Sequence, residues 1–558
     1  MARIAGLTVA ALLLAGAAGP CWGGLPGKDA TPRASLGVSS QLYVVRHDRW
    51  SDADELGYRN FIAAIGESVC DSVDACLHSD ANPYRDSDPP DHKFVSDCAE
   101  LPYILRFYYA WKNGLPFSYV SGVASLDRGS DDERYSHLGN KVTARTDVPS
   151  GVMTGYEIID RIRGTVSSAS YRIDPDSDSP LAPDFYSPAI APGSIRPGTV
   201  LYDPSGHVAI VYRVDRDGRV HCFDAHTDYS LTQMVFDLRF ARAKPGEGAG
   251  FKNWRPIRLV GAGDVDGSLR GGRIRTARNA EIPDFSDEQY YGNGARPAEA
   301  KWADGVFTLN AEKLDYYDYV RARLAGGQLV FNPLREVRET VQSICWDLHY
   351  RVAAVNLAVA AGIAQKPEPR RLPRNIYGTS GEWEVYSTPS RDARLKTVFK
   401  ALRDTVRRFV EMNKRGDARH LSYSGNDLVG DMLTAYENAT QYCKIDYRRS
   451  DGSSVTLSYE DVRKRLFAMS FDPYHSPERR WGATDPAELS TSTDDAVKSV
   501  WYAGEQGLRN QIDRTYDARM DFTIDQLRTS GPGRGAADPP DTDVQGYLER
   551  ARDGGAKN

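Results

Sequence analysis

The sequence lacks any run or stripe of basic residues. Its 70 lysines and arginines are outnumbered by 76 acidic residues, which gives a formal net charge of −6 at pH 7 over 558 residues. Nucleic-acid-binding surfaces concentrate positive charge to neutralise phosphates. The composition therefore gives no reason to expect a nucleic-acid partner.

Long apolar runs are also missing, with one exception near the N-terminus. Small and aliphatic residues from Ile4 to Ala18 follow a basic residue and form a stretch shorter than the ~20 residues that span a membrane. We expect a cleaved signal peptide over residues 1–23, and hence a periplasmic or secreted protein with no membrane span after its removal. A lipoprotein anchored at Cys21 is the weaker alternative, because Pro20 is unfavourable before a lipidated cysteine.

Cysteine is scarce, with seven in the whole chain. An exported protein can form disulfides, and Cys70 and Cys76 are close enough in sequence to bridge at the end of a helix. Cys345 and Cys443 both lie in helical patterns, where they either join two helices or stay as buried thiols. Cys98 remains, and an unpaired thiol in an oxidising compartment is a liability unless it is buried or has a function.

The chain is long enough for several domains of ~100–200 residues. Residues 41–260 mix helical and strand patterns, whereas residues 261–304 lack periodicity and are expected to form a linker. Residues 305–530 are helical, and the Gly- and Pro-rich tail over residues 531–558 is expected to be disordered. The expected fold class is α+β, with a helix packed on an antiparallel sheet and a mainly α-helical C-terminal region.

Two long helices are the clearest elements of the C-terminal region. One begins at Asn332-Pro333, a cap residue followed by proline, and ends at Gly362 after apolar residues spaced three or four apart. The second begins at Thr388-Pro389. We expect the two to pack as antiparallel neighbours, in a region that could also bind a protein partner.

Cys98 lies in the segment DCAELPYILRFYYAW. Asp97 is a good helix cap and an apolar-aromatic helical run follows, which predicts Cys98 at a helix N-terminus. The positive end of a helix favours thiolate over thiol, and the backbone N–H of Cys98 would be free to stabilise an oxyanion. A small buried cysteine is the common alternative, so the segment is informative only together with a base.

His207 is the candidate base. The segment RPGTVLYDPSGHVAIVYRV predicts a strand, a turn and a second strand that begins at His207. A turn at Asp217-Gly218 then returns the chain as RVHCFDAH, which predicts an antiparallel hairpin. A histidine at the end of this sheet could accept a proton from a thiol on a helix packed against it.

The order of a cysteine helix, an R-P-G strand, G-H-V-A-I-V and a hairpin return resembles the NlpC-type and CHAP-type papain-like cysteine peptidases and amidases. The resemblance covers about residues 95–228 and implies a papain-like fold, with Cys98 as nucleophile and His207 as general base. The chain departs from both patterns after the cysteine, where Ala99 and its neighbours replace the usual Gly or Ser. The polar segments between Cys98 and His207 are also long.

The resemblance leaves three candidates for the third catalytic residue. The CHAP pattern implies Asp224, with His226 as a polar neighbour or an alternative, and the NlpC pattern implies His221. Side chains alternate along a strand, so Cys222, Asp224 and His226 are expected on one face and His221 on the other. We favour Asp224, because a carboxylate best fixes the required tautomer of His207.

These observations predict an exported cysteine hydrolase that cleaves an amide bond. The resemblance implies cell-wall peptidoglycan, or another peptide amide, as substrate. A zinc-like set of Cys222, Asp224, His226 and His207 is a weaker interpretation, because such ligands usually come as closer pairs in loops; we expect no metal and no cofactor. The alternatives are a non-catalytic envelope binding or scaffolding protein on the same fold, and a thiol acyltransferase.

Overall fold

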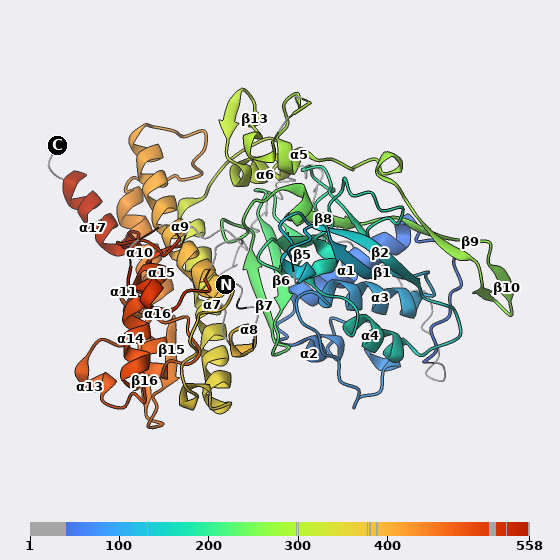
Figure 1. Ribbon diagram of the computed structural model, residues 1–558. Helices are drawn as coiled ribbons and strands as arrows, with labels where there is room; N and C mark the ends of the chain where they lie inside the picture. The colour runs from blue at the N-terminus through green and yellow to red at the C-terminus, as the bar shows by residue number, and fades with distance from the viewer. Residues whose placement is uncertain are drawn as a thin grey trace, which may run out of the picture.

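The computed structural model describes residues 41–558, except 131, 297, 300, 377, 379–380, 387–388, 513–519, 530, 532 and 556–558. The expected signal peptide and Cys21 lie outside the described residues. The first half of the described chain builds an antiparallel sheet with helices, and the second half is largely helical (Figure 1). The expected α+β class is confirmed.

A six-stranded antiparallel sheet forms the centre of the first half. Its strand order is β3-β8-β4-β5-β6-β7. The strands are β3 (Phe185–Tyr186), β4 (Val200–Asp203), β5 (His207–Val214), β6 (Val220–Ala225), β7 (Leu231–Val235) and β8 (Gly250–Trp254). The predicted hairpin is therefore formed by β5 and β6, with a register irregularity between Val211 and Arg213.

Helices α1 (Asp52–Glu67) and α3 (Leu101–Asn113) cover one face of this sheet. Val208, Ile210 and Phe223 share a buried apolar cluster with residues of both helices. The alternate residues Val211 and Cys222 belong to a second cluster, together with helix α6 (Tyr316–Leu324). The two clusters follow the alternation expected for central strands that are buried on both faces.

Shorter elements surround the sheet. They are α2 (Val73–Leu77), β1 (Ser118–Ser125), β2 (Asn140–Asp147), α4 (Gly155–Arg163), α5 (Glu288–Tyr291), β13 (Phe307–Leu309) and β14 (Glu312–Leu314). Strands β1 and β2 pair as a separate hairpin, as do β13 and β14.

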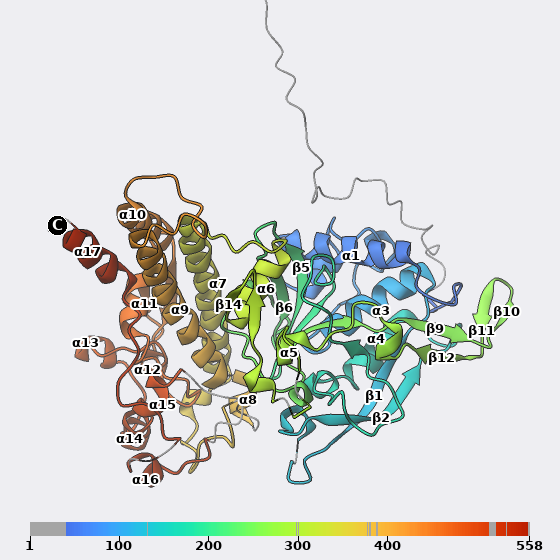
Figure 2. The same ribbon diagram turned by 90° about the horizontal axis from the view of Figure 1, so that it is seen from above.

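An arm of paired strands occupies part of the region expected to be a linker. Strand β9 (Ile257–Val260) pairs with β12 (Arg273–Thr276), and β10 (Gly263–Val265) pairs with β11 (Ser268–Arg270) between them. In Figure 2 the arm projects away from the helical half. Part of the expected linker or surface loop thus forms short strands, which the sequence did not indicate because Gly-rich turns between short strands leave no long periodic pattern.

The helical half is built on α7 (Pro333–Ala360), α9 (Pro389–Lys414) and α10 (Leu428–Thr440). The side chain of Asn332 caps α7 by accepting from the N–H of Arg335, so the predicted start is confirmed. Helices α7 and α9 pack against one another as expected. The remaining elements are α8 (Glu382–Tyr386), β15 (Lys444–Arg448), β16 (Ser454–Ser458), α11 (Tyr459–Arg465), α12 (Pro477–Arg480), α13 (Pro486–Leu489), α14 (Ala496–Gly504), α15 (Gln506–Asn510) and α16 (Ile524–Leu527).

The C-terminal tail over residues 531–558 was expected to be disordered, but part of its described stretch is helical. It ends in helix α17 (Val544–Gly555), which packs against α10. Val544 and Leu548 are 1% and 0% exposed and join the apolar core of the helical half. Two apolar residues one helical turn apart therefore anchor a segment whose composition is otherwise polar.

Two disulfides are present among the described residues: the first was expected, and the second was one of two alternatives for its cysteines. Cys70–Cys76 joins the chain after α1 to α2, and Cys345–Cys443 joins α7 to the segment after α10. Cys98 and Cys222 are free. Disulfides of this kind are consistent with an oxidising, extracytoplasmic compartment.

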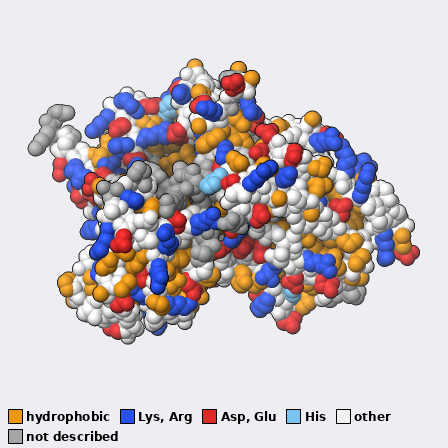
Figure 3. Space-filling model, viewed as in Figure 1, with side chains coloured by type: hydrophobic (Ala, Val, Ile, Leu, Met, Phe, Trp, Pro, Cys, Tyr) orange, Lys and Arg blue, Asp and Glu red, His pale blue; other side chains and the backbone are white. Residues whose placement is uncertain are grey.

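The two halves pack together along α7, which lies beside β7 (Figure 1). Ion pairs cross this boundary, including Arg239 with Asp347 at 2.8 Å and Arg335 with Asp215 at 2.5 Å. Basic and acidic side chains are interspersed over the face shown in Figure 3. No helix among the described residues combines the length and the apolar character needed to cross a bilayer.

Candidate active site

Cys98 lies in the turn immediately before α3 and is capped locally. One carboxylate oxygen of Asp97 accepts hydrogen bonds from the backbone N–H groups of Ala99 (2.9 Å) and Glu100 (3.0 Å). Asp97 therefore caps the turn that holds Cys98, whereas α3 itself begins at Leu101 with Glu100 as its N-cap residue and no side-chain cap. Because those two N–H groups are occupied, the N–H of Cys98, which donates to no other described residue, is the group left for an oxyanion.

The sulfur of Cys98 lies against strand β5. The backbone N–H of Val208 is close enough to lower the pKa of the thiol, and Val208 directly follows His207. Consecutive residues are about 3.8 Å apart at their Cα atoms, so the thiol lies close to the backbone of His207. The structure thus places Cys98 near the start of β5, although the sequence separates the two residues by more than a hundred positions.

The electrostatics of Cys98 differ from the expectation. Burial and then the adjacent carboxylate of Asp97 raise the pKa of the Cys98 thiol, since both disfavour a negative sulfur. Arg394 acts in the opposite direction but does not outweigh them. Burial and Asp97 therefore oppose the thiolate that a helix N-terminus was expected to favour, so the thiol needs a base to ionise.

His207 and Asp224 form the closest polar pair of the site. His207 Nε2 lies 2.5 Å from Asp224 Oδ2, and the carboxylate is fully buried. Burial alone would raise the pKa of Asp224, but His226 and His207 beside it lower the pKa overall. With Nε2 held by the carboxylate, Nδ1 of His207 is the ring nitrogen available for proton exchange with a thiol.

The second oxygen of Asp224 is held by a residue that the sequence did not point to. Thr232 Oγ1, on β7, donates to Asp224 Oδ1 at 2.7 Å and accepts from His226 Nε2 at 2.9 Å. His226 itself lies 3.6 Å from Asp224 Oδ2, so it supports the carboxylate through Thr232. Burial lowers the pKa of His226 to about 4, which keeps its ring neutral near pH 7.

His221 is outside this constellation. Its Nε2 lies 2.9 Å from Asp215 Oδ2, and Arg213 approaches the same ring. Strand alternation places it on the opposite face of β6 from Asp224, as expected. Cys222 is 0% exposed within the apolar cluster under α6. Of the three candidates for a third catalytic residue, Asp224 is therefore the one in hydrogen-bond contact with His207.

The helical half completes the site, which the sequence did not indicate. Tyr350 of α7 stacks on His226 with ring centroids 3.7 Å apart, and Arg391 of α9 donates to the Tyr350 hydroxyl at 3.0 Å. Arg394 of α9 donates to Ser205 Oγ, in the turn before β5, at 2.9 Å. Side chains of α7 and α9, which lie far along the chain, thus cover His207 and His226.

A cleft opens between the sheet and these helices. His207, Asp224, His226 and Thr232 line one side, and Asp347, Tyr350, Arg391 and Arg394 line the other. Its free space is about 610 Å³, counting the part open to solvent. Cys98 is not among the residues that line the cleft.

A cluster able to ligate a metal lies elsewhere among the described residues. Glu368, Asp472 and His475, all in the helical half, offer ligand atoms within 4.8 Å of one another. Both ring nitrogens of His475 are engaged, by Ser470 Oγ at 2.6 Å and by the carbonyl of Lys498 at 3.1 Å. The zinc-like set weighed from the sequence, Cys222 with Asp224, His226 and His207, does not form such a cluster.

Comparison with known proteins found no match to any family model, curated protein or solved structure.

Proposed function

We propose that this protein is an exported cysteine hydrolase that cleaves an amide bond, with Cys98, His207 and Asp224 as its catalytic residues. The observation that carries the proposal is the 2.5 Å contact between His207 and Asp224. The residue after His207, Val208, lies near the Cys98 sulfur and lowers the pKa of the thiol. A nucleophile, a base and a residue that orients the base are the parts that thiol catalysis requires.

The proposed reaction uses each group at a stated atom. Nδ1 of His207 takes the thiol proton as the sulfur of Cys98 attacks the amide carbonyl carbon. The resulting oxyanion accepts a hydrogen bond from the N–H of Cys98. His207 then gives the proton to the leaving amine, and water hydrolyses the thioester, restoring the thiol. Asp224 holds the tautomer of His207 that makes both proton transfers possible.

The substrate class comes from the resemblance rather than from the cleft. Residues 95–228 resemble NlpC-type and CHAP-type enzymes, so peptide crosslinks and stems of peptidoglycan are the proposed substrates. The raised pKa of Cys98 supports a mechanism in which proton transfer to His207 accompanies attack.

Turnover of purified peptidoglycan, followed by the release of new amino groups, tests the proposal. Cys98→Ala is expected to abolish release, and iodoacetamide is expected to inactivate the wild type by alkylating Cys98. Cys222→Ala is the matched control, because Cys222 is the other free cysteine and lies in the apolar core. Full turnover by Cys98→Ala would overturn the proposal.

A second candidate is a non-catalytic scaffolding protein on the same fold. Two observations favour it: side chains of α7 and α9 cover His207 and His226, and the Cys98 thiol is buried. It predicts peptidoglycan binding that Cys98→Ala leaves unchanged and no release of amines by either protein. A thiol acyltransferase would instead form a new amide when an amine acceptor is supplied, which mass spectrometry of the products distinguishes.

A further inference from the structure

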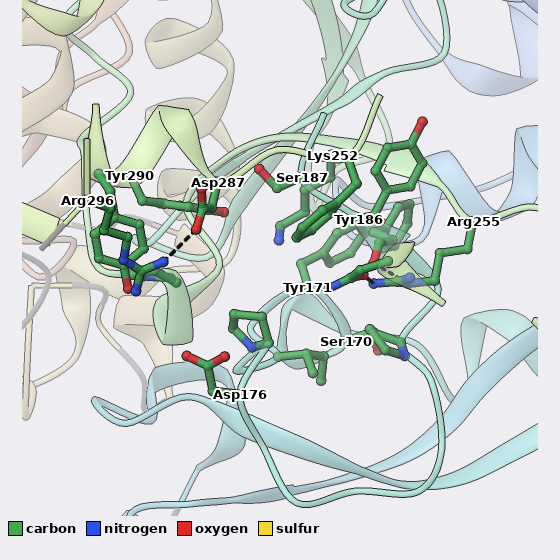
Figure 4. A pocket seen from close by; sticks show the side chains of 18 residues that line it. Ser170, Tyr171, Asp176, Tyr186, Ser187, Lys252, Arg255, Asp287, Tyr290 and Arg296 are labelled. Carbon is green, nitrogen blue, oxygen red and sulfur yellow. Dashed lines mark hydrogen bonds and ion pairs between the residues drawn. The ribbon is translucent and has the colours of Figure 1, made fainter. Parts of the chain in front are cut away.

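A second cavity lies in the first half, away from the cleft over His207. Tyr171, Phe185, Tyr186, Phe285 and Tyr290 supply aromatic walls. Its free space is about 740 Å³, counting the part open to solvent. Figure 4 shows Lys252 reaching from β8 into the space between the Tyr171 ring and the Arg296–Asp287 pair.

The amine of Lys252 is the unusual group in this cavity. The residue is 8% exposed, and its amine has no hydrogen-bond or ion-pair partner among the described residues. A buried ammonium without a partner is costly. Burial, reinforced by Arg255, lowers the pKa of Lys252 to about 7. The side chain is therefore poised between a neutral amine and a cation at ordinary pH.

The other charged groups of the cavity are already paired. Arg255 donates to the carbonyls of Phe185 and Ala277 and to Asn279. Arg296 pairs with Asp287 at 2.5 Å. Lys252 is therefore the cationic side chain lining the cavity that has no hydrogen-bond or ion-pair partner among the described residues, whereas both arginines are already engaged.

We propose that this cavity binds a carboxylate carried on an aromatic or other apolar body, with the carboxylate on Lys252. One free ammonium suits a singly charged carboxylate better than a phosphate, which is usually held by several donors. The aromatic walls suit a flat apolar body, because such rings gain from stacked or edge contacts. This binding site is additional to the proposed catalytic cleft and does not depend on hydrolase activity.

Binding should also be linked to pH, because the ligand favours the charged form of Lys252. Above the pKa of Lys252 in the free protein, its amine must take up a proton when the carboxylate ligand binds. The affinity for the ligand therefore falls about tenfold for each pH unit above that pKa. Affinity is therefore expected to fall about 100-fold between pH 6 and pH 9. The titratable or permanently charged groups that face the cavity are Arg255, Arg296, Asp176, Asp287, Tyr171, Tyr186, Tyr290 and Tyr291.

Calorimetry on the full chain with benzoate and its neutral isostere benzamide tests the proposal. At pH 6 benzoate is expected to bind at least tenfold more tightly than benzamide. At pH 9 the two affinities are expected to be equal. Lys252→Met should remove the preference while keeping the benzamide affinity. Lys313→Met, at an exposed lysine on β14, is the matched control and should change neither affinity.

A second measurement keeps the test decisive if Lys252→Met folds poorly. Reductive methylation with ¹³C-formaldehyde labels lysines, and the signal of Lys252 is the one that disappears in Lys252→Arg. This signal is expected to titrate near pH 7 and to shift when benzoate, but not benzamide, is added. Equal binding of the two probes by the wild type, or a Lys252 signal unmoved by benzoate, would overturn the proposal.

Discussion

At the scale of single residues, the environment of Asp224 determines what His207 can do. The carboxylate is fully buried, and one of its oxygens is hydrogen-bonded to His207 and the other to Thr232. A buried carboxylate with both oxygens hydrogen-bonded stays ionised and fixed in place. In the proposed mechanism it both selects the tautomer of His207 and stabilises the ring once it is protonated.

Asp224→Asn tests this role, because it keeps the shape of the side chain and removes its charge. We expect kcat for peptidoglycan turnover to fall about 10²- to 10⁴-fold with little change in KM, as the wrong tautomer of His207 becomes favoured. Thr232→Val is the milder companion variant and should lower kcat about tenfold, since one oxygen of Asp224 loses a partner. A wild-type kcat in Asp224→Asn, or a larger loss in Thr232→Val, would contradict the assignment.

Sequence reasoning reached some of these residues and missed others for a physical reason. His207 and Asp224 were found because strand alternation and a hairpin fix their relative positions locally. Thr232 lies on the next strand and Tyr350 on α7, and both reach the site only through tertiary packing. The sign of the Cys98 pKa shift was also missed, because burial depends on the whole fold while a helix N-terminus depends on a few residues.

At the scale of elements, the two disulfides constrain loops of very different length. Cys345 and Cys443 are separated by 98 positions, whereas Cys70 and Cys76 are separated by 6. A crosslink stabilises mainly by restricting the unfolded chain, and the effect grows with the length of the loop it closes. The long bridge also ties α7, which carries Tyr350, to the chain after α10.

We therefore expect the paired alanine variants to differ in stability. Cys345→Ala with Cys443→Ala should lose about 4–5 kcal/mol of unfolding free energy, and Cys70→Ala with Cys76→Ala about 2 kcal/mol, on loop entropy alone. Urea denaturation of the two double variants beside the wild type measures the difference. Equal losses, or a larger loss for the short loop, would mean that native packing and not loop entropy sets the contribution.

A buried acidic cluster in the helical half gives a second prediction at this scale. Glu505 is 0% exposed, both of its carboxylate oxygens lack a hydrogen-bond partner, and Arg509 lies 3.7 Å from one of them. Burial and then the nearby Asp472 raise the pKa of Glu505 well above its usual value. The folded state thus binds a proton that the unfolded state releases above pH 4.5.

Stability should therefore fall as pH rises from about 5 to 8, since the unfolded chain binds fewer protons over this range. One group that stays protonated contributes up to about 4 kcal/mol across three pH units. Glu505→Gln should flatten this dependence, and Glu437→Gln, at an exposed position of α10, is a control that keeps it. Thermal melts at several pH values measure the effect. A melting temperature that falls on dialysis with EDTA would indicate that a divalent cation, rather than a proton, neutralises the cluster.

The long helices were predictable from sequence and the short elements were not. Asn332 before Pro333 and a sustained apolar spacing define α7 without reference to any other part of the chain. Strands β10 and β11 have three residues each, and α17 is held by an apolar pair that becomes informative only when α10 lies beside it. Short elements depend on the surfaces they pack against, and those surfaces come from distant sequence.

At the scale of the whole molecule, the helical half is part of the candidate site. The sequence left its role open, because nothing in its periodic pattern distinguishes a helix that packs on its own bundle from one that covers a cleft. Arg239, at 7% exposure, links the halves through Asp347 at 2.8 Å and Ser343 at 3.0 Å. The pair lies in the same cleft as His207 and Asp224.

Breaking the Arg239–Asp347 pair should therefore affect both stability and activity. Arg239→Met leaves both Asp347 and Asp237 without their partner, and we expect a loss of about 2–4 kcal/mol in unfolding free energy. Arg239→Met with Asp347→Leu should recover part of that loss, because Asp347 then carries no unpaired charge while Asp237 still does. Arg419→Met, at the exposed pair with Glu312, is the matched control and should cost less than about 1 kcal/mol. Urea denaturation of these variants, of Asp347→Leu alone and of the wild type measures the losses.

If the double variant is stable but turns over peptidoglycan more slowly than the wild type, the pair also positions the helices over the cleft. Strictly additive losses in the two single variants and the double variant would instead mean that Arg239 and Asp347 contribute independently.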